Sequence, residues 1–461
     1  MTSDRSLMPA DGGFWGRTCS VLPLLLICSS IALTLVVDDT ASAIWWLLAA
    51  AGLFAWFRLR RACRDDRLLR WQLIACGAGL PLFALNAIQA DVAYEHIRLF
   101  EKFLRWSVLG LVVGLCLSSV RRLRPALLVT AVIALALAGI YGVEQKLDGV
   151  DRPGGAVNCI FFGNQLMTLA LICLLAALST WRWWISLPLI ACACIGMAVS
   201  MWSGTRSSLV ALAVLAVLLP WLIRRRPRFW QWSLVPLFLL IAVSVVWVAK
   251  PRIVDRLQDG GRHVVQWIDD DSAAIRRTSV GARLSTWQHC LTLWQQEPVS
   301  GVGIGDYRRE MRALAQIHPR DAANGIIWQH HAHSIYFHLL ATTGLLGLSL
   351  VCGALLILPA MQFWRILRRV DDPRRRFPAI AGMAVVVSFA CYGLTETWVV
   401  ISAFASAYVT LLAPLLAAAH REWLTVQQQQ EQMDGVAVVE GRTEPALSMQ
   451  MAVLPESYSV V

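Results

Sequence analysis

The chain has 461 residues, of which 57% are hydrophobic and 15% charged, and its mean hydropathy is +0.57. A soluble protein of this length would show amphipathic patterns, whereas here apolar stretches of about 17–25 residues recur, the length that crosses a hydrocarbon core. The net charge of +11 does not indicate nucleic-acid binding, because the basic residues cluster in short loops between those stretches.

The apolar stretches predict an all-α polytopic membrane protein with about twelve transmembrane helices. The first is interpreted as a retained anchor, although the "ASA" at 41–43 resembles a signal-peptide cleavage site. The predicted spans cover roughly residues 20–37, 43–58, 71–88, 103–120, 126–142, 160–179, 183–201, 207–223, 233–249, 335–358, 378–395 and 400–418.

Arginine-rich loops alternate along the chain with loops that are poor in arginine or acidic. The positive-inside rule therefore places both termini in the cytoplasm and the long loop 250–334 on the other side of the membrane. The basic loops are residues 58–70, 121–124, 224–228 and 365–376.

This topology divides the chain into four parts. Residues 1–249 form a membrane domain with spans one to nine, 250–334 a large helical insert on the non-cytoplasmic side, and 335–420 a membrane part with spans ten to twelve. Residues 421–461 form a cytoplasmic tail, which its polar, low-complexity composition predicts to be disordered.

Arg206 begins the eighth predicted span on the non-cytoplasmic side, where the positive-inside rule disfavours arginine. It is interpreted either as an interfacial side chain that reaches back to water or as part of an anion clamp. In the second interpretation the neighbouring serines, among them Ser207, and the N–H groups of the helix start contribute donors. The position alone leaves both interpretations open.

The insert contains a predicted helix over 283–298, ended by Pro298. Its apolar positions recur at spacings of three and four, which predicts a stripe that rests on the membrane surface or on the tops of the spans. Arg283 opens this helix and opposes the macrodipole there, a cost that an anionic ligand would relieve. A solvated surface arginine is the competing interpretation. The stripe consists of Leu284, Trp287, Leu291 and Trp294.

The "SGVGIGDY" turn at 300–307 follows this helix. Its third glycine is misplaced for a dinucleotide fingerprint, so we expect the glycines to allow close backbone packing or the approach of a ligand. The acidic run 269–271 is interpreted as a solvated loop, because three consecutive carboxylates cannot all face one metal ion. Cys159 and Cys290 are expected to be accessible, either as two thiols or as a disulfide.

Three histidines precede the tenth predicted span and a fourth, His338, lies within it. His333, beside Ser334, meets the positive end of a helix, which favours the neutral ring and makes it a candidate general base. His338 lies five residues further and points about 140° away, so a second functional role and a packing role both remain open for it. His330 and His331 are predicted to be loop residues.

Three motifs follow one another in the C-terminal half: "GTRSS" at 204–208, "RLSTWQHCLTLWQQEPVSGVGIGDY" at 283–307 and "HSIYFHLLATTGLLGL" at 333–348. Their order and spacing resemble the O-antigen ligase/polymerase superfamily over roughly residues 150–420. The family signature is a His, then Asn, Ser or Gln, then nine residues, Gly, two residues and Gly. The matching positions here are His333, Ser334, Gly344 and Gly347. Thr342 stands where many relatives carry an acidic residue.

The resemblance implies an inverting, metal-independent glycosyltransferase of the lipid-sugar-dependent, GT-C-like class that needs no cofactor. The donor would be an O-antigen polysaccharide on undecaprenyl diphosphate, at the periplasmic face of the bacterial inner membrane. In the ligase branch, which makes lipopolysaccharide, the acceptor is a sugar hydroxyl of lipid A–core.

The same resemblance gives roles to individual residues. It implies that His333 activates the acceptor, while Arg206 and Arg283 bind the diphosphate and stabilise charge on the leaving group. The substrate-binding set is expected to include, besides the two arginines, Ser207, Ser334, Tyr336 and His338.

Three other functions remain as alternatives. An O-antigen polymerase or a protein O-oligosaccharyltransferase would use the same donor and a different acceptor. A transporter or flippase of lipid-linked sugars would place polar residues at mid-membrane. Here the ionisable residues gather at the ends of the spans, with Glu396 and His338 as partial exceptions.

Overall fold

The computed structural model describes residues 25–32, 35, 40–53, 55–88, 104–107, 109–117, 120–155, 158–180, 182–222, 250–269, 273–319 and 329–451. In these residues the regular structure is helical, and six helices are long and apolar enough to cross a membrane. The prediction of an all-helical polytopic membrane protein is therefore confirmed. The ninth predicted span, 233–249, lies outside the described residues.

The N-terminal half follows the predicted spans with two differences in detail. The second span divides into an apolar helix that ends at Leu53 and an arginine-rich helix that begins at Trp56. The fifth begins six residues early, at Val120, and so includes the basic "RRLR" segment. The helices are α2 (Thr40–Leu53), α3 (Trp56–Asp65), α4 (Arg67–Ile88), α6 (Leu109–Leu117), α7 (Val120–Leu147), α8 (Cys159–Ser179), α9 (Trp183–Trp202) and α10 (Arg206–Leu222).

The second half contains the insert and the last membrane helices. In the insert lie α12 (Lys250–Asp269), α13 (Ala273–Arg276), α14 (Ser279–Gln296) and α15 (Tyr307–Ile317). There follow α17 (Ile335–Cys352), the π-helical η2 (Gly353–Ile357), α18 (Leu358–Arg369), α19 (Pro373–Gly393), the 3-10 turn η3 (Trp398–Val400) and α20 (Ser402–Met451). Helices α17, η2 and α18 form one helical run, longer than the predicted span.

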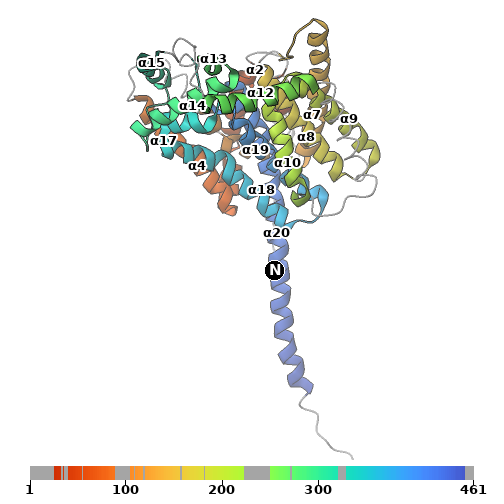
Figure 1. Cartoon of the computed structure of the whole chain (residues 1–461). Helices are drawn as coiled ribbons and strands as arrows, with labels where there is room; N and C mark the ends of the chain where they lie inside the picture. Colours follow the sequence, from red (N-terminus) through yellow and green to blue (C-terminus); the bar gives the residue numbers. More distant parts are fainter. Residues whose placement is uncertain are drawn as a thin grey trace, which may run out of the picture.

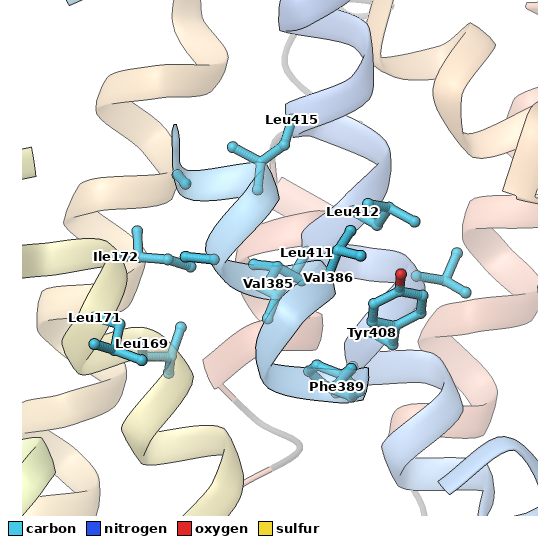
Figure 2. Packing of buried hydrophobic residues seen from close by; sticks show 14 of the residues in the cluster. Leu169, Leu171, Ile172, Val385, Val386, Phe389, Tyr408, Leu411, Leu412 and Leu415 are labelled. Atoms are coloured by element: carbon cyan, nitrogen blue, oxygen red, sulfur yellow. The ribbon is translucent and has the colours of Figure 1, made fainter. Parts of the chain in front are cut away.

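Helices α8, α19 and α20 form the centre of the membrane domain. Helix α8 packs against α9 and α19, and α19 packs against α20. Every residue of α8 from Phe161 to Ser179 is buried, as expected for a helix that is apolar on all sides. Figure 2 shows leucine, isoleucine and valine side chains of α8, α19 and α20 meeting Phe389 and Tyr408 in this core.

The insert and the end of α20 lie at opposite ends of the molecule (Figure 1). Helices α12 to α15 lie together at one end, while α20 extends past the other end as a single helix. The tail is thus helical as far as Met451, where its composition predicted disorder. Glutamine, glutamate and methionine are good helix formers, so a polar tract that continues a long helix can remain helical without a tertiary contact.

A buried charged network ties α4, α18 and α20 together at the end opposite the insert. The Asp66 carboxylate accepts hydrogen bonds from the Leu69 N–H group and from Arg365, whose Nη1 lies 2.7 Å from Oδ1. His420 Nδ1 lies 3.0 Å from the other carboxylate oxygen. Burial raises the pKa of Asp66, but the hydrogen bonds from His420 and Arg365 outweigh that effect and hold the pKa well below its usual range.

Asp66→Asn is expected to lower the free energy of unfolding by about 3 kcal/mol, because it leaves Arg365, whose side chain is only 13% exposed, without its counter-charge. The lowered pKa of Asp66 means that its contribution is complete at neutral pH and is lost only as the pH falls below about 4. Thermal unfolding of the detergent-purified protein measures the effect. The exposed neighbour Asp65 supplies the control Asp65→Asn, and equal unfolding temperatures for the two variants would contradict the expectation.

Candidate active site

The glycine-rich turn after α14 docks into a break in α17. Four backbone hydrogen bonds join the two segments: Val302 N–H to Ala341 O, Gly303 N–H to Thr342 O, Leu345 N–H to Pro298 O and Leu346 N–H to Val299 O, at 2.9–3.2 Å. They satisfy donors and acceptors on both sides of the break. The expectation of close backbone packing in this turn is therefore confirmed.

The break itself is made by Gly344, whose φ of 62° lies in the left-handed region inside α17. A Cβ there would lie 2.3 Å from the backbone of Val299, and one on Gly301 would lie 2.3 Å from the N atom of Thr343. Only glycine fits such an approach of two backbones. The first glycine of the sequence signature thus joins the insert to the membrane helix that follows His333.

Helix α14 ends before Pro298 as predicted, but it begins at Ser279, so Arg283 lies one turn inside the helix and the expectation that it opens the helix is wrong. The predicted apolar stripe is only partly its contact face. Trp287 stacks on Phe337 of α17 at a centroid distance of 4.9 Å, whereas Leu291 is exposed.

The buried face of α14 instead contains polar side chains, which a hydrophobic pattern does not detect. Thr286 donates to Ala282 O at 2.8 Å, and Ser285 accepts from Trp267 of α12 at 3.1 Å. It comprises Gly281, Ser285, Thr286, His289, Cys290 and Leu293.

The loop 329–334 is fixed to its surroundings at three points. Gln329 accepts a hydrogen bond from Thr286, the Trp287 indole N–H donates to Ala332 O at 2.9 Å, and the Ser334 hydroxyl donates to Gly393 O at 3.1 Å. Between the last two lies His333, with φ at 49°. A non-glycine residue in this conformation is strained, and such strain is found at functional sites, where the surroundings maintain it.

Glu396 joins two of the predicted catalytic residues. Its Oε1 accepts a hydrogen bond of 3.1 Å from Arg283, and its Oε2 lies 3.6 Å from His333 Nδ1. The Glu396 side chain is 5% exposed, in the turn between α19 and η3. At 3.6 Å the contact with His333 Nδ1 is longer than a hydrogen bond, so the buried carboxylate lies beside the ring without fixing its tautomer.

A cavity of about 370 Å³ adjoins this group. It is lined by the ends of several elements that are far apart in the sequence, and its charged residues are Arg152, Arg206, Arg283 and Glu396. Arg206 and Arg283, which are 77 positions apart in the sequence, thus line one pocket. The apolar part of the lining comprises Ile160, Val264, Val280, Leu284 and Trp287.

Two helix N-termini add to the positive potential of the pocket. Helix α10 begins at Arg206, and Thr205 and Ser207 line the cavity beside it. Helix α14 begins at Ser279, which also lines the cavity, and Thr278 caps it by accepting from Gly281 N–H. Helix starts attract anions, and arginine adds bidentate donors. The pocket is therefore suited to a phosphorylated group.

Of the other predicted site residues only Ser207 lines this pocket, and the candidate base His333 is connected to the lining through Glu396. Ser207 lines it and donates to Asn164 Oδ1 at 2.9 Å. The hydroxyl groups of Ser334 and Tyr336 donate to backbone carbonyls of α19, so they hold α17 against α19. His338 is buried, with its ring 4.9 Å from that of Tyr307, and neither it nor Tyr336 is among the pocket-lining residues.

The prediction that Cys290 is accessible is wrong. The side chain is fully buried beneath α15, with Sγ 4.0 Å from the Tyr307 hydroxyl, and Cys159 and Cys290 are not bonded to each other. Burial raises the pKa of the Cys290 thiol to about 12, so it stays protonated at neutral pH. Of the acidic run, Asp269 is exposed, as expected of a solvated residue, while the other two residues lie outside the described part.

Sequence reasoning did not predict that Arg152 and Glu396 would line the candidate site. Arg152 ends an otherwise acidic loop, and its Nε donates to Ser203 O at 2.9 Å, next to the start of α10. The sequence contains a signal for Glu396 as a candidate functional residue, because it is an ionisable residue within an apolar stretch. Its two partners, 113 and 63 positions away in sequence, could not be inferred from that signal.

Comparison with known proteins gives a match to one part of the chain. A search of curated proteins gave no match. A model of the O-antigen ligase family matches residues 190–352, about a third of the chain. The match contains Arg206, Arg283 and His333 but neither Arg152 nor Glu396. This domain is shared by O-antigen ligases and polymerases, which are glycosyltransferase-type enzymes that use lipid-linked polysaccharides. The chain is therefore a multi-pass membrane protein whose residues 190–352 are similar to the O-antigen ligase family.

Proposed function

We propose that the protein is an O-antigen ligase that transfers a polysaccharide from undecaprenyl diphosphate to a sugar hydroxyl of lipid A–core. The observation that carries the proposal is the Arg283–Glu396–His333 group at the edge of an arginine-lined cavity. One carboxylate contacts both a cation suited to a diphosphate and an imidazole suited to deprotonate a hydroxyl. These are the two functions that such a transfer requires.

In the proposed reaction His333 Nε2 takes the proton of the acceptor hydroxyl as its oxygen attacks the anomeric carbon of the donor sugar. The bond from that carbon to the diphosphate oxygen breaks, and the configuration inverts. Arg283, Arg206 and Arg152 stabilise the negative charge that develops on the leaving diphosphate. Glu396 stabilises the imidazolium formed at His333.

The proposed location is the bacterial inner membrane, with both termini in the cytoplasm and the site facing the periplasm. The distribution of arginine between the loops supports it. The placement of the insert and the tail at opposite ends of the molecule agrees with that orientation (Figure 1). Finished O-antigen would then meet lipid A–core at the outer end of the spans, as lipopolysaccharide biosynthesis requires.

His333→Ala, Arg206→Ala and Arg283→Ala test this function in a strain that lacks the native protein. We expect each variant to be made at the normal level, while lipopolysaccharide on gels loses its O-antigen ladder and undecaprenyl-linked polymer accumulates. Loss of the base is expected to lower the rate by at least about 100-fold. Arg64→Ala and His318→Ala replace exposed residues outside the pocket and serve as matched controls.

Two outcomes would contradict the proposal. Core that carries a single repeat unit would assign the protein to the polymerases, which share the donor chemistry. A normal O-antigen ladder in all three site variants would show that the pocket takes no part in the reaction.

A further inference from the structure

One aromatic side chain, Trp287, lines the cavity and has no part in the reaction described above. Among the described residues that line the cavity it is the one aromatic ring. Trp287 lies four residues after Arg283 on α14, so the two side chains share a face of that helix. The indole is half-buried. Part of its surface is therefore open to whatever occupies the cavity.

The indole is held in one orientation by two contacts. One of its faces stacks on the ring of Phe337, with the ring planes 10° apart. Its N–H group donates to Ala332 O at 2.9 Å. Because the polar group of the ring already has a partner, the surface that Trp287 offers to the cavity is carbon. That surface consists of the face away from Phe337 and the adjoining edge of the benzene ring.

Trp287 lies between the residues proposed for the leaving group and for the base. Four residues along a helix correspond to about 6 Å, which separates Trp287 from Arg283, the proposed diphosphate ligand. Its hydrogen bond is made to Ala332, the residue directly before His333. In an inverting transfer the anomeric carbon lies between the diphosphate oxygen and the attacking oxygen. The sugar that carries this carbon therefore adjoins the indole.

We propose that Trp287 is the stacking surface for the first sugar of the donor, the pyranose that is bonded to the diphosphate; the inference rests on the proposed ligase function. One face of a pyranose presents C–H groups, which pack on an aromatic ring while the hydroxyl groups point away from it. The π face also attracts positive charge. Such charge develops on the ring oxygen and the anomeric carbon as a glycosidic bond breaks.

The rest of the apolar lining has a different chemistry. It is aliphatic, and it comes from three helices: α8 supplies Ile160, α12 supplies Val264, and α14 supplies Val280 and Leu284. Aliphatic side chains offer a prenyl chain the contacts that it finds in the bilayer, but they offer no flat ring to a sugar. The alternative that the indole contacts the prenyl chain is separated from the proposal by experiment.

Trp287→Leu and Trp287→Phe form the test pair. Both variants lose the indole N–H group and its bond to Ala332, and only phenylalanine keeps an aromatic face. Initial rates are measured with the purified full-length protein, an undecaprenyl-diphosphate-linked glycan as donor and lipid A–core as acceptor. We expect the kcat/KM for the donor to be about tenfold lower in Trp287→Leu than in Trp287→Phe. The acceptor KM is expected to agree within about twofold.

Binding of undecaprenyl diphosphate without a glycan distinguishes the sugar from the lipid. We expect its Kd to be equal, within about twofold, for Trp287→Leu and the wild type, because this ligand lacks the stacked ring. Arg206→Ala is expected to raise the same Kd, since it removes a diphosphate ligand. A Kd raised about tenfold in Trp287→Leu would overturn the sugar assignment and place the prenyl chain on the indole.

Trp294→Leu is the matched control. Trp294 lies two turns further along α14, its N–H group also donates to a backbone carbonyl, that of Pro298 at 3.1 Å, and it is not a lining residue. We expect this variant to keep the donor kcat/KM within about twofold. Trp287→Met, which also fills the site without an aromatic ring, is measured in parallel, so that the comparison stands if one aliphatic variant does not fold.

The remaining outcomes separate this subsite from the proposed function. Equal donor kcat/KM in Trp287→Leu, Trp287→Met and Trp287→Phe, with His333→Ala inactive, would overturn the stacking subsite alone. Activity of His333→Ala near that of the wild type would overturn the proposed function itself.

Discussion

Replacing Glu396 with Gln is expected to lower kcat for polysaccharide transfer by about 100-fold, while the protein is still made and folded. The amide is neutral, so it cannot stabilise the imidazolium that forms at His333 when the acceptor hydroxyl loses its proton. It also removes the charged partner of Arg283, which lies 3.1 Å from the carboxylate. Steady-state kinetics on the purified protein, together with the lipopolysaccharide ladder in cells, measure the loss.

Two further variants distinguish positioning from general destabilisation. Glu396→Asp keeps the charge on a shorter side chain and is expected to recover part of the activity. Glu422→Gln removes the carboxylate of another arginine ion pair, that with Arg375, and is expected to leave transfer unchanged. Activity of Glu396→Gln near that of the wild type would show that Glu396 has no part in the reaction.

The second large effect is expected for Gly344→Ala, on folding rather than on chemistry. The new Cβ would lie 2.3 Å from the carbonyl group of Val299, in a backbone conformation with φ at 62° that alanine adopts at a cost. Both the helix break and its hydrogen bonds to the turn would have to shift. We expect a loss of at least about 3 kcal/mol in the free energy of unfolding.

Gly353→Ala is a stringent control for this expectation. It lies in the same helical run, nine residues further, and a Cβ there meets nothing within 4 Å. Thermal unfolding in detergent is expected to show normal stability for Gly353→Ala and a strongly lowered midpoint, or no recoverable folded protein, for Gly344→Ala. Equal midpoints for the two variants would contradict the structural role assigned to Gly344.

The membrane architecture was predictable because apolar length and arginine placement are local properties of the sequence. The second span illustrates the limit of that reasoning, since the change from α2 to the arginine-rich α3 falls inside one apolar window. The contact face of α14 was only partly predicted for a related reason. Ser285 and His289 are buried there, and a pattern based on hydropathy assigns such residues to the surface.

The candidate site was predictable only where single positions were unusual. Arg206 stood out as a cation at a helix start and His333 beside an N-cap, while Arg283 was expected at a helix start but lies one turn inside α14. Glu396 could not be connected to them, because its distances to Arg283 and His333 depend on how the α19–η3 turn packs against the insert. Nothing in the sequence marked Arg152 as a candidate functional residue, because the loop that it ends is distinguished by its acidic residues.

The turn docked into the break of α17 has a consequence for how the two substrates meet. Arg283 belongs to α14, which leads into that turn, and His333 directly precedes α17, so four backbone hydrogen bonds connect the elements that carry them. Rotation of one helix alone would break those bonds. In the proposed reaction, the spacing between the leaving group and the attacking oxygen would thereby be set by the protein before either lipid-bound substrate binds. The two large, slowly diffusing substrates would then only have to bind in the right orientation. Little of their translational and rotational entropy would remain to be lost during the transfer step.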